Sequence, residues 1–193
     1  MIRLATIADA AAMLQIYSPF IINTTVTFEY EVPSEQDFQM RIQQYLEKWP
    51  WLVWVENGEV VGYAYASSYR PREAYQWCVE CSVYIHPQFS KLGIATKLYS
   101  ALIKLLKFQG FCSLYAVIDL PNPASVGFHE KMGFQYFATY ENVGYKLGQW
   151  RNVGWWKYTL AEPGANPSVP IFLKEIDSQK IQQIFEADIN KGI

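Results

Sequence analysis

Cysteine, histidine and net charge are all scarce in this sequence. Three cysteines among 193 residues are too few for a disulfide framework, which favours a reducing cytoplasm, and two histidines offer little for a metal site. The net charge is −2 and the pI about 5.7, far below the ~9 typical of nucleic-acid-binding domains. No apolar run approaches the ~18 residues of a membrane span. We therefore expect a cytoplasmic protein that binds neither nucleic acid nor membrane.

Apolar and aromatic residues are abundant by contrast, at 51% and 17% of the chain. A chain of this size and composition can bury a core of its own, so we expect one folded domain over residues 1–160. Residues 161–170 contain three prolines and a glycine, which is typical of a linker. The tail, 161–193, also carries apolar residues at helical spacing that predict a terminal helix: Ile176, Ile181, Ile184, Phe185 and Ile189.

The period of the apolar residues alternates between strand and helix along the chain. Strand-like runs occur at 2–6, 51–55, 60–68, 77–86, 113–118, 134–142 and 150–160, and 23–28 reads as extended. Helical spacing predicts helices from Thr6 or Asp9 to Tyr17, where Pro19 should end the first, and over 34–48, 93–108 and 122–132. Asn57-Gly58 predicts a hairpin, and Ser34 followed by Asp37 predicts a helix cap. This order indicates an α+β fold around a mixed sheet.

The stretch from Tyr84 to Thr96 is the first that indicates a ligand-binding site. A strand ends at Ile85-His86-Pro87, a short loop follows, and Gly93-Ile94-Ala95 opens a long helix. Such a junction presents unpaired backbone N–H groups at the positive end of a helix dipole, and small residues let a ligand approach the backbone. The junction suits a phosphate or pyrophosphate, although many helices begin near a glycine, so the signal is weak by itself.

A second stretch makes the combination specific. Asn122 to Phe134 follows a buried strand, and Asn122 and His129 lie seven residues apart on one face of a helix. Together with the glycine-led helix start, this arrangement resembles the GNAT superfamily of acetyltransferases. Three further stretches, 23–28, 69–75 and 79–87, resemble the phosphinothricin and methionine-sulfoximine acetyltransferases within it. The resemblance covers residues 2 to 160 and implies a GNAT fold, a central mixed twisted sheet flanked by helices.

The resemblance also implies a site for acetyl-CoA. The residues it assigns to the cofactor are Val83, Tyr84, Ile85, Lys91, Leu92, Gly93, Ile94, Ala95, Thr96, Asn122 and Ser125. The loop holds the pyrophosphate, Asn122 contacts the pantetheine arm, and a backbone N–H in 83–85 stabilises the oxyanion. One departure stands out: relatives carry two basic residues in this loop, and here Ser90-Lys91-Leu92 keeps one. We therefore expect weaker CoA binding than in a typical relative.

Two residues are candidates for catalysis. Glu80 is a carboxylate in an otherwise apolar strand, where alternation places it on one face with Ser82 and Tyr84. It is either a solvent-facing residue or, by the resemblance, the general base that removes a proton from an ammonium substrate. His129 occupies a position that is often a tyrosine in the family. It is either a packed residue or an acid that protonates the departing thiolate.

Arg70 and Arg72 are the clearest indication of the substrate. Two guanidinium groups two residues apart in an extended segment can bind a carboxylate or phosphinate, and they would repel a cationic substrate. The alternative is a pair of solvated surface residues. By resemblance, Phe28 lines the same pocket. The CxxC formed by Cys78 and Cys81 predicts no metal or redox site, because the two side chains fall on opposite faces of a strand and only Cys112 remains as a further cysteine.

These observations predict an N-acetyltransferase that moves the acetyl group of acetyl-CoA directly to the amino group of a small amino-acid analogue. The resemblance implies acceptors such as phosphinothricin or methionine sulfoximine and sulfone, no metal, and a homodimer. Two alternatives remain open. The protein could be a GNAT enzyme with another amine substrate, or a CoA-binding sensor with little turnover.

Overall fold

A mixed sheet organises the computed structural model, which describes residues 1–189. In spatial order its seven strands are β1 (Ile2–Leu4), β2 (Trp51–Glu56), β3 (Glu59–Ser68), β4 (Cys78–Ile85), β5 (Ser113–Leu120), β7 (Gln149–Thr159) and β6 (Gln135–Lys146). Neighbouring strands are antiparallel except β4 and β5, which are parallel. The predicted α+β architecture around a mixed sheet is confirmed.

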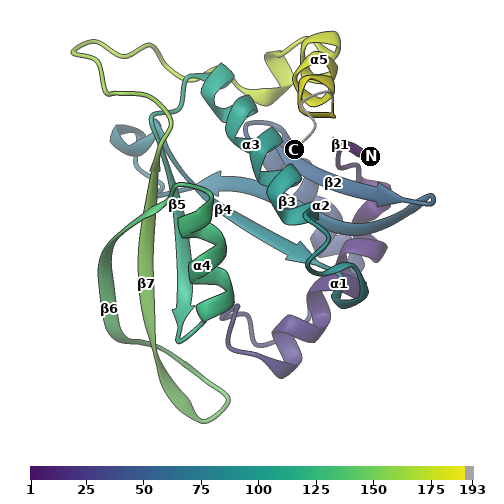
Figure 1. Cartoon of the computed structure of the whole chain (residues 1–193), viewed down its shortest axis with the longest axis vertical. Helices are drawn as coiled ribbons and strands as arrows, with labels where there is room; N and C mark the ends of the chain where they lie inside the picture. Colours follow the sequence, from purple (N-terminus) through teal and green to yellow (C-terminus); the bar gives the residue numbers. More distant parts are fainter. Residues whose placement is uncertain (190–193) are drawn as a thin grey trace.

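Helices cover both faces of this sheet (Figure 1). One face packs against α1 (Ala10–Asn23) and α2 (Glu35–Leu46), and the other against α3 (Ile94–Gln109), α4 (Pro123–Lys131) and α5 (Ser178–Ile189). Strand alternation divides the core accordingly. In β3, Tyr63 belongs to the cluster under α1 and α2, whereas Ala64 belongs to the cluster under α3. None of the helices within residues 1–189 is both long enough and apolar enough to cross a membrane.

Several element boundaries follow from local chemistry. The Asn57-Gly58 hairpin forms as predicted, with φ angles of 49° and 87° that suit these two residue types. The Ser34 hydroxyl accepts a hydrogen bond of 3.1 Å from the Asp37 N–H at the start of α2. Gly93 and Gly110 bound α3 in left-handed conformations. These boundaries depend on neighbouring residues alone, which is why the sequence predicted them.

The first helix differs from the prediction. The expectation that Pro19 ends it was wrong, because α1 continues through the proline to Asn23. A proline inside a helix removes one backbone hydrogen bond. Here Tyr17 and Ile21 are buried on either side of it, and the Ser18 hydroxyl donates to the Leu14 carbonyl oxygen over 2.6 Å. Burial of the apolar face in the core outweighs the local penalty. Of the segment 23–28, which the sequence predicted to be extended, Asn23 ends α1 and residues 24–28 form part of the loop between α1 and α2 without joining a strand.

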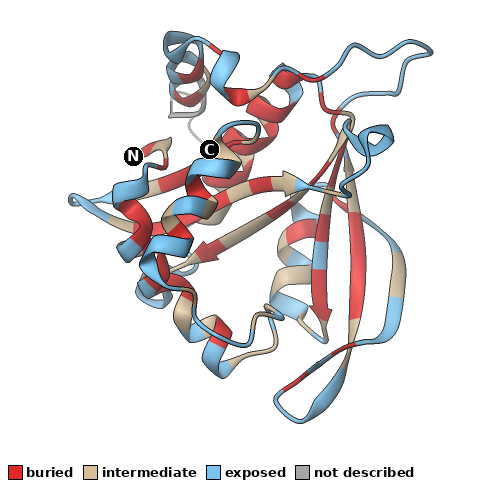
Figure 2. Ribbon diagram, turned by 180° about the vertical axis from the view of Figure 1, so that it is seen from behind, coloured by how far each residue is buried: buried red, intermediate tan, exposed pale blue. Residues whose placement is uncertain are grey.

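The tail packs onto the same core as the rest of the chain. The predicted terminal helix is present as α5, and it lies beside α3 in Figure 1. Its buried residues Ile181 and Phe185 belong to the core cluster of α3, together with Leu173 and Ile176, which precede the helix. The side chain of Ile189 lies outside the described part of α5. Figure 2 shows how α3, mostly buried, is enclosed between the sheet and the tail.

Candidate active site

The two parallel strands at the centre of the sheet pair over only half their length. The β4–β5 ladder runs from Cys78 opposite Ser113 to Cys81 opposite Ala116 and stops there. Beyond that point β4 continues to Ile85 and remains paired with β3 on its other side, while β5 continues to Leu120 beside β7. The two strands therefore separate toward their carboxyl ends (Figure 1).

This separation leaves backbone hydrogen-bonding groups of β4 without a strand partner. The His86 N–H donates to the Val61 carbonyl oxygen over 2.9 Å, on the β3 side. Because these groups alternate along a strand, those of Tyr84 also face β3, and those of Val83 and Ile85 face the gap toward β5. A peptide-like ligand inserted in the gap can bind both. The ring of Tyr84 itself is packed against the ring of Tyr17, with ring centres 4.8 Å apart, and its role toward the cofactor stays a prediction.

The start of α3 lies at the end of the loop that follows β4. Gly93 caps the helix in a left-handed conformation with φ of 77°, and Lys91 also has a positive φ, 63°. The first helical hydrogen bond runs from the Lys97 N–H to the Gly93 carbonyl oxygen, 3.1 Å. The N–H groups of residues 93–96 therefore precede the helical ladder and are available to an anion. Leu92 is 63% exposed and leaves this approach open.

Glu80 lies on the face of β4 toward α1 and α2. Its neighbours Val79 and Cys81 point into the opposite core, as the alternation predicted. The Glu80 side chain is 27% exposed. Burial raises its pKa to about 7, and the nearby Arg70 guanidinium opposes this rise, with Nη1 3.6 Å from Oε1. At neutral pH a carboxylate with this pKa can accept a proton from an amine.

Arg70 rests on a group of aromatic side chains. Its guanidinium lies 4.6 Å from the centre of the Tyr69 ring and 5.4 Å from that of Trp155. Tyr69 in turn stacks on Tyr115 of β5, with ring centres 4.7 Å apart. Sequence reasoning missed this aromatic support, although Tyr115 and Trp155 do lie on the Glu80 face by strand alternation. The contacts orient Arg70 toward Glu80.

Arg72 has a different environment. It is exposed at the start of the 3-10 turn Glu73–Tyr75 and makes no ion pair with any residue in 1–189. The sequence predicted that both arginines face the substrate. The structure brings Arg70 to Glu80 and leaves Arg72 as the guanidinium free to meet an anionic group arriving from solvent.

Comparison with known proteins identifies the family. The model of the acetyltransferase (GNAT) domain matches residues 2–155. The chain belongs to the GNAT acetyltransferase family. It is 40% identical to the phosphinothricin N-acetyltransferase of Streptomyces viridochromogenes over 84% of this chain and 88% of the relative. It is 33% identical to the L-methionine sulfoximine/L-methionine sulfone acetyltransferase of Salmonella typhimurium over 85% of this chain and 96% of the relative.

Comparison with a solved structure shows that the chain also shares the fold of this family. The phosphinothricin acetyltransferase of Sinorhizobium meliloti, in complex with acetyl-CoA, superimposes with a TM-score of 0.83 at 32% identity. The match covers 87% of this chain and 92% of that one. The predicted GNAT fold and acetyltransferase family are therefore confirmed. The aligned region ends near the start of the tail, so α5 is a feature of this GNAT enzyme that the family model does not include.

In this GNAT enzyme, the side chains predicted for the site at the start of α4 and on it make hydrogen bonds within the protein. The Asn122 side chain caps the helix, and its Oδ1 accepts from the Ser125 N–H over 3.1 Å. His129 is only 5% exposed, its Nδ1 donates to the Ser125 carbonyl oxygen over 2.8 Å, and its Nε2 accepts from the Tyr99 hydroxyl over 3.1 Å. Burial lowers the pKa of His129, which favours the neutral ring. These contacts match the packed alternative. The catalytic role stays a prediction, and it requires that the ring exchange Tyr99 for the thiolate.

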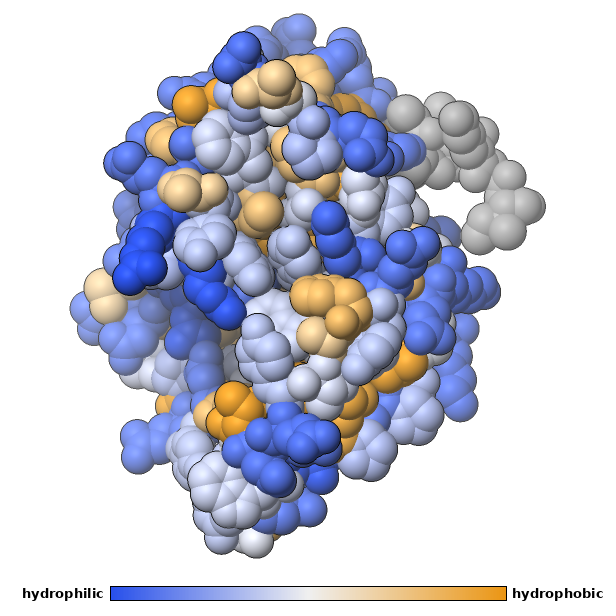
Figure 3. Space-filling view, turned by 90° about the vertical axis from the view of Figure 1, so that its left-hand side faces the viewer, coloured by the Kyte–Doolittle hydropathy of each residue, from blue (hydrophilic) through white to orange (hydrophobic). Residues whose placement is uncertain are grey.

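Beyond β4, the face of the sheet that carries Glu80 is not covered by α1 and α2, and we call it the open face. Phe28 lies at the other end of this open face from Arg70. It belongs to the loop after α1, and its ring packs against Gly144 near the end of β6. Figure 3 faces the outer side of the β6–β7 hairpin and shows apolar side chains scattered among hydrophilic ones over this surface. The predicted substrate residues thus border the open face at both ends, rather than forming a single cluster.

The cysteines show no arrangement for metal or redox chemistry. All three are free, and burial raises the pKa of Cys81 to about 12. The Cys81 thiol donates to the Tyr115 carbonyl oxygen over 3.4 Å. Within residues 1–189 no three His, Cys, Asp or Glu side chains lie close enough to hold a metal ion.

Proposed function

We propose that this GNAT enzyme transfers the acetyl group of acetyl-CoA to the amino group of a small amino-acid analogue of the phosphinothricin or methionine sulfoximine and sulfone type. The observation that carries the proposal is Glu80, a half-buried carboxylate with a pKa of about 7 next to the gap between β4 and β5. The relatives that share most of this chain bear the names of enzymes with these substrates.

The gap and the start of α3 fit acetyl-CoA, which supplies the activated acetyl group. The backbone groups of Val83 and Ile85 suit the amide-bearing pantetheine arm, and the N–H groups of residues 93–96 suit the pyrophosphate. Lys91 supplies a positive charge at the loop. A backbone N–H of β4 in the gap would donate to the thioester oxygen as negative charge develops there.

Glu80 acts on the acceptor. An amino acid arrives with its amine mostly protonated at neutral pH, and the ammonium must lose a proton before its nitrogen can attack a carbonyl carbon. Glu80 takes this proton directly or through one water molecule. The nitrogen then attacks the thioester carbonyl carbon, the C–N bond forms and the C–S bond breaks. The amine nitrogen loses a second proton as it becomes an amide, and the CoA thiolate takes up one proton and leaves as the thiol. No covalent bond to the enzyme is formed.

Arg72 and Arg70 provide the selectivity for an acidic acceptor. Arg72 is exposed and unpaired among the described residues, so it can bind a carboxylate or phosphinate bidentately. Arg70, beside Glu80, adds a second positive charge to this segment. Two guanidinium groups in one short segment disfavour polyamines and aminoglycosides, whose positive charges they would repel.

The test is the release of free thiol from acetyl-CoA in the presence of a panel of acceptors. Phosphinothricin, methionine sulfoximine and methionine sulfone should be acetylated, and spermidine and an aminoglycoside should not. Rapid acetylation of spermidine with no reaction of any amino acid would overturn the assignment of the substrate while leaving the enzyme class intact.

A second candidate is a CoA-binding sensor with little turnover. The observation in its favour is the loop Ser90-Lys91-Leu92, which has one basic residue and an exposed leucine where relatives have two basic residues. Calorimetry with acetyl-CoA and the thiol assay together decide between the two, since a sensor binds acetyl-CoA and releases no thiol with any acceptor. The homodimer and the cytoplasmic location stay predictions.

A further inference from the structure

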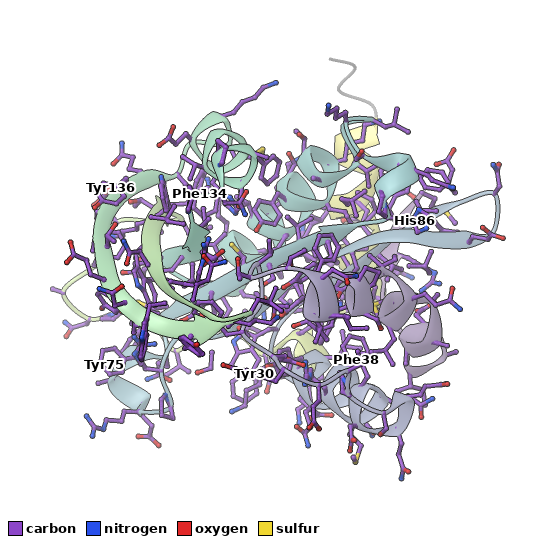
Figure 4. The ribbon with its side chains drawn as sticks, turned by 90° about the horizontal axis from the view of Figure 1, so that it is seen from below. Tyr30, Phe38, Tyr75, His86, Phe134 and Tyr136 are labelled. Atoms are coloured by element: carbon purple, nitrogen blue, oxygen red, sulfur yellow. The ribbon has the colours of Figure 1, made fainter. Side chains whose placement is uncertain are left out.

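The loop between α1 and α2, residues 24–34, is hydrogen-bonded to β5 and β6; we call this loop the acceptor strap. The Thr25 hydroxyl donates to Asp119 Oδ2 at the end of β5 over 2.6 Å. The Lys146 ammonium donates to the Thr27 carbonyl oxygen over 2.6 Å, and the Tyr30 hydroxyl donates to the Tyr145 carbonyl oxygen. In Figure 4, Tyr30 lies between the curved strands of the β6–β7 hairpin and helices α1 and α2.

The strap crosses the gap where β4 and β5 separate. On the β4 side, the Thr27 hydroxyl bonds to the Tyr17 hydroxyl over 2.7 Å, and the Tyr17 ring packs on Tyr84. On the β5 side it is held by Asp119, which lies on the same face of β5 as Val117. Val117 is 39% exposed, on the face that carries Glu80. The strap is therefore a wall at the carboxyl ends of both strands, opposite the arginines.

The charges that hold the strap are buried at high cost. Lys146 is only 2% exposed, and burial lowers its pKa, which Asp119 and Glu29 partly counteract. Asp119 is fixed by Arg151 through two bonds of 2.7 and 2.9 Å. Burying a charge without full compensation is costly, so the contacts of this ammonium must offset part of that cost. Among the described residues, its hydrogen bond goes to the backbone of the strap.

The β6–β7 hairpin has a glycine at the point where the strap packs against it. Gly144 is the residue at which the β6–β7 ladder resumes after the register irregularity that follows Tyr140, and it lies directly under the Phe28 ring. A Cβ at this position would overlap several atoms of that ring. The close approach of Phe28 to the hairpin therefore requires glycine at 144. The strap is thus fixed by hydrogen bonds on one side and by steric fit on the other.

We propose that Lys146 is a positioning residue which, with the Asp119–Arg151 pair, holds the acceptor strap so that Phe28 and Thr27 form a preformed wall for the side chain of the acceptor. The inference rests on the proposed function for the identity of the acceptor. It explains why a lysine is buried far from Glu80. Lys146 makes no contact with the acetyl donor in this account, so its loss affects the two substrates differently.

The experiment compares Lys146→Met and Thr25→Val with wild type, and Lys131→Met serves as a control for the loss of a lysine elsewhere. We expect Lys146→Met to raise KM for the best acceptor of the panel about 10-fold, equivalent to ~1.4 kcal/mol, with kcat and KM for acetyl-CoA unchanged. Amide hydrogen exchange over 24–34 should accelerate. Thr25→Val should show a smaller change of the same kind and supplies the test if Lys146→Met does not fold.

Two outcomes would overturn the inference. Unchanged exchange over 24–34 would mean that Lys146 does not hold the strap. Faster exchange with a wild-type KM for the acceptor would mean that the strap does not border the substrate. Either result leaves the proposed function standing, because both are measured on an active enzyme. A wild type that acetylates no member of the panel would instead contradict the proposed function, and the exchange comparison would still decide what Lys146 holds.

Discussion

The two faces of the sheet differ in how completely helices cover them. Under α3, α4 and α5, residues such as Leu98 and Leu102 are fully buried, and the core extends from β1 to β7. Under α1 and α2, the core reaches only from β2 to β4. Beyond β4 that face is open, and Val117 and Tyr140 are 39% and 45% exposed there.

The titratable groups differ in the same way. On the covered face, both nitrogens of His129 have partners and its pKa is lowered by burial. On the open face, no described residue makes a hydrogen bond to the Glu80 side chain that would offset its burial; the Arg70 guanidinium lies 3.6 Å away, and the pKa of Glu80 rises to about 7. The two faces of the sheet therefore differ in packing: one is covered by helices, and the other has an acid with a raised pKa beside a gap.

The largest effect should follow from removal of the carboxylate on the open face. We expect Glu80→Gln to lower kcat by roughly 10²–10⁴-fold, the usual size of a general-base contribution, with acetyl-CoA affinity nearly intact. Steady-state kinetics and calorimetry measure the two quantities. Glu73→Gln, an exposed neighbour in the turn after Arg72, is the matched control. Wild-type turnover in Glu80→Gln would remove this residue from the mechanism.

On the covered face we expect a substitution to lower the stability of the protein and to leave its turnover unchanged. Phe185→Ala should lower the free energy of unfolding by about 3–5 kcal/mol, since a buried phenylalanine leaves a cavity, and should leave kcat of the folded protein unchanged. Chemical denaturation followed by tryptophan fluorescence measures the change. Gln182→Ala, exposed on the same helix, should have little effect. An unaltered stability in Phe185→Ala would show that the tail is not part of the core in solution.

A third effect concerns the substrate end of the open face. Arg72→Ala should raise KM for the amino-acid acceptor by about 10- to 150-fold, because a charge-assisted hydrogen bond contributes about 1.5–3 kcal/mol. Arg72→Lys should restore only part of this loss, since a point charge does not reproduce a planar fork. The affinity for acetyl-CoA, measured by calorimetry, should be the same in all three proteins. Equal KM values for Arg72→Ala and wild type would make this arginine a surface residue.

The pH dependence of the reaction tests the raised pKa of Glu80 on the open face. Glu80 must be deprotonated to act as a base, so kcat/KM should rise with pH, about tenfold per unit below the pKa of about 7, and level off above it. Arg70 lowers this pKa, so Arg70→Gln should move the inflection to higher pH. A pH–rate profile from about pH 3.5 to 9 measures both. An inflection near 4.5, the ordinary value for a glutamate, would mean that the base is exposed to solvent.

The smallest effect on turnover is expected at the histidine of the covered face. His129→Asn should lower the free energy of unfolding by about 1–3 kcal/mol, because buried partners lose their hydrogen bonds. We expect kcat to stay within the same order of magnitude, since the ring is enclosed between α3 and α4. A fall of about 10²-fold or more in a folded variant would establish the alternative, that the histidine protonates the leaving thiolate.

Sequence reasoning located the elements and residues that depend on near neighbours. The hairpin at Asn57-Gly58, the cap at Ser34 and the limits of α3 follow from conformational preferences of a few adjacent residues. The position of Glu80 also follows, because strand alternation alone places its side chain opposite Val79 and Cys81. The family could be predicted for the same reason, since its motifs are short and contiguous.

Contacts between distant segments decided the rest. Pro19 stays inside α1 because residues on both sides of it pack into the core, and α5 docks because α3 presents an apolar surface to it. Contacts between distant segments also place the aromatic rings of Tyr69 and Trp155 against Arg70. Lys146 bonds to the strap although 119 residues of sequence separate it from Thr27. By itself the sequence determined which groups can do acid–base chemistry and where helices and strands begin. Only the tertiary structure decided which groups are desolvated, because burial and charge pairing depend on segments that the chain brings together when it folds.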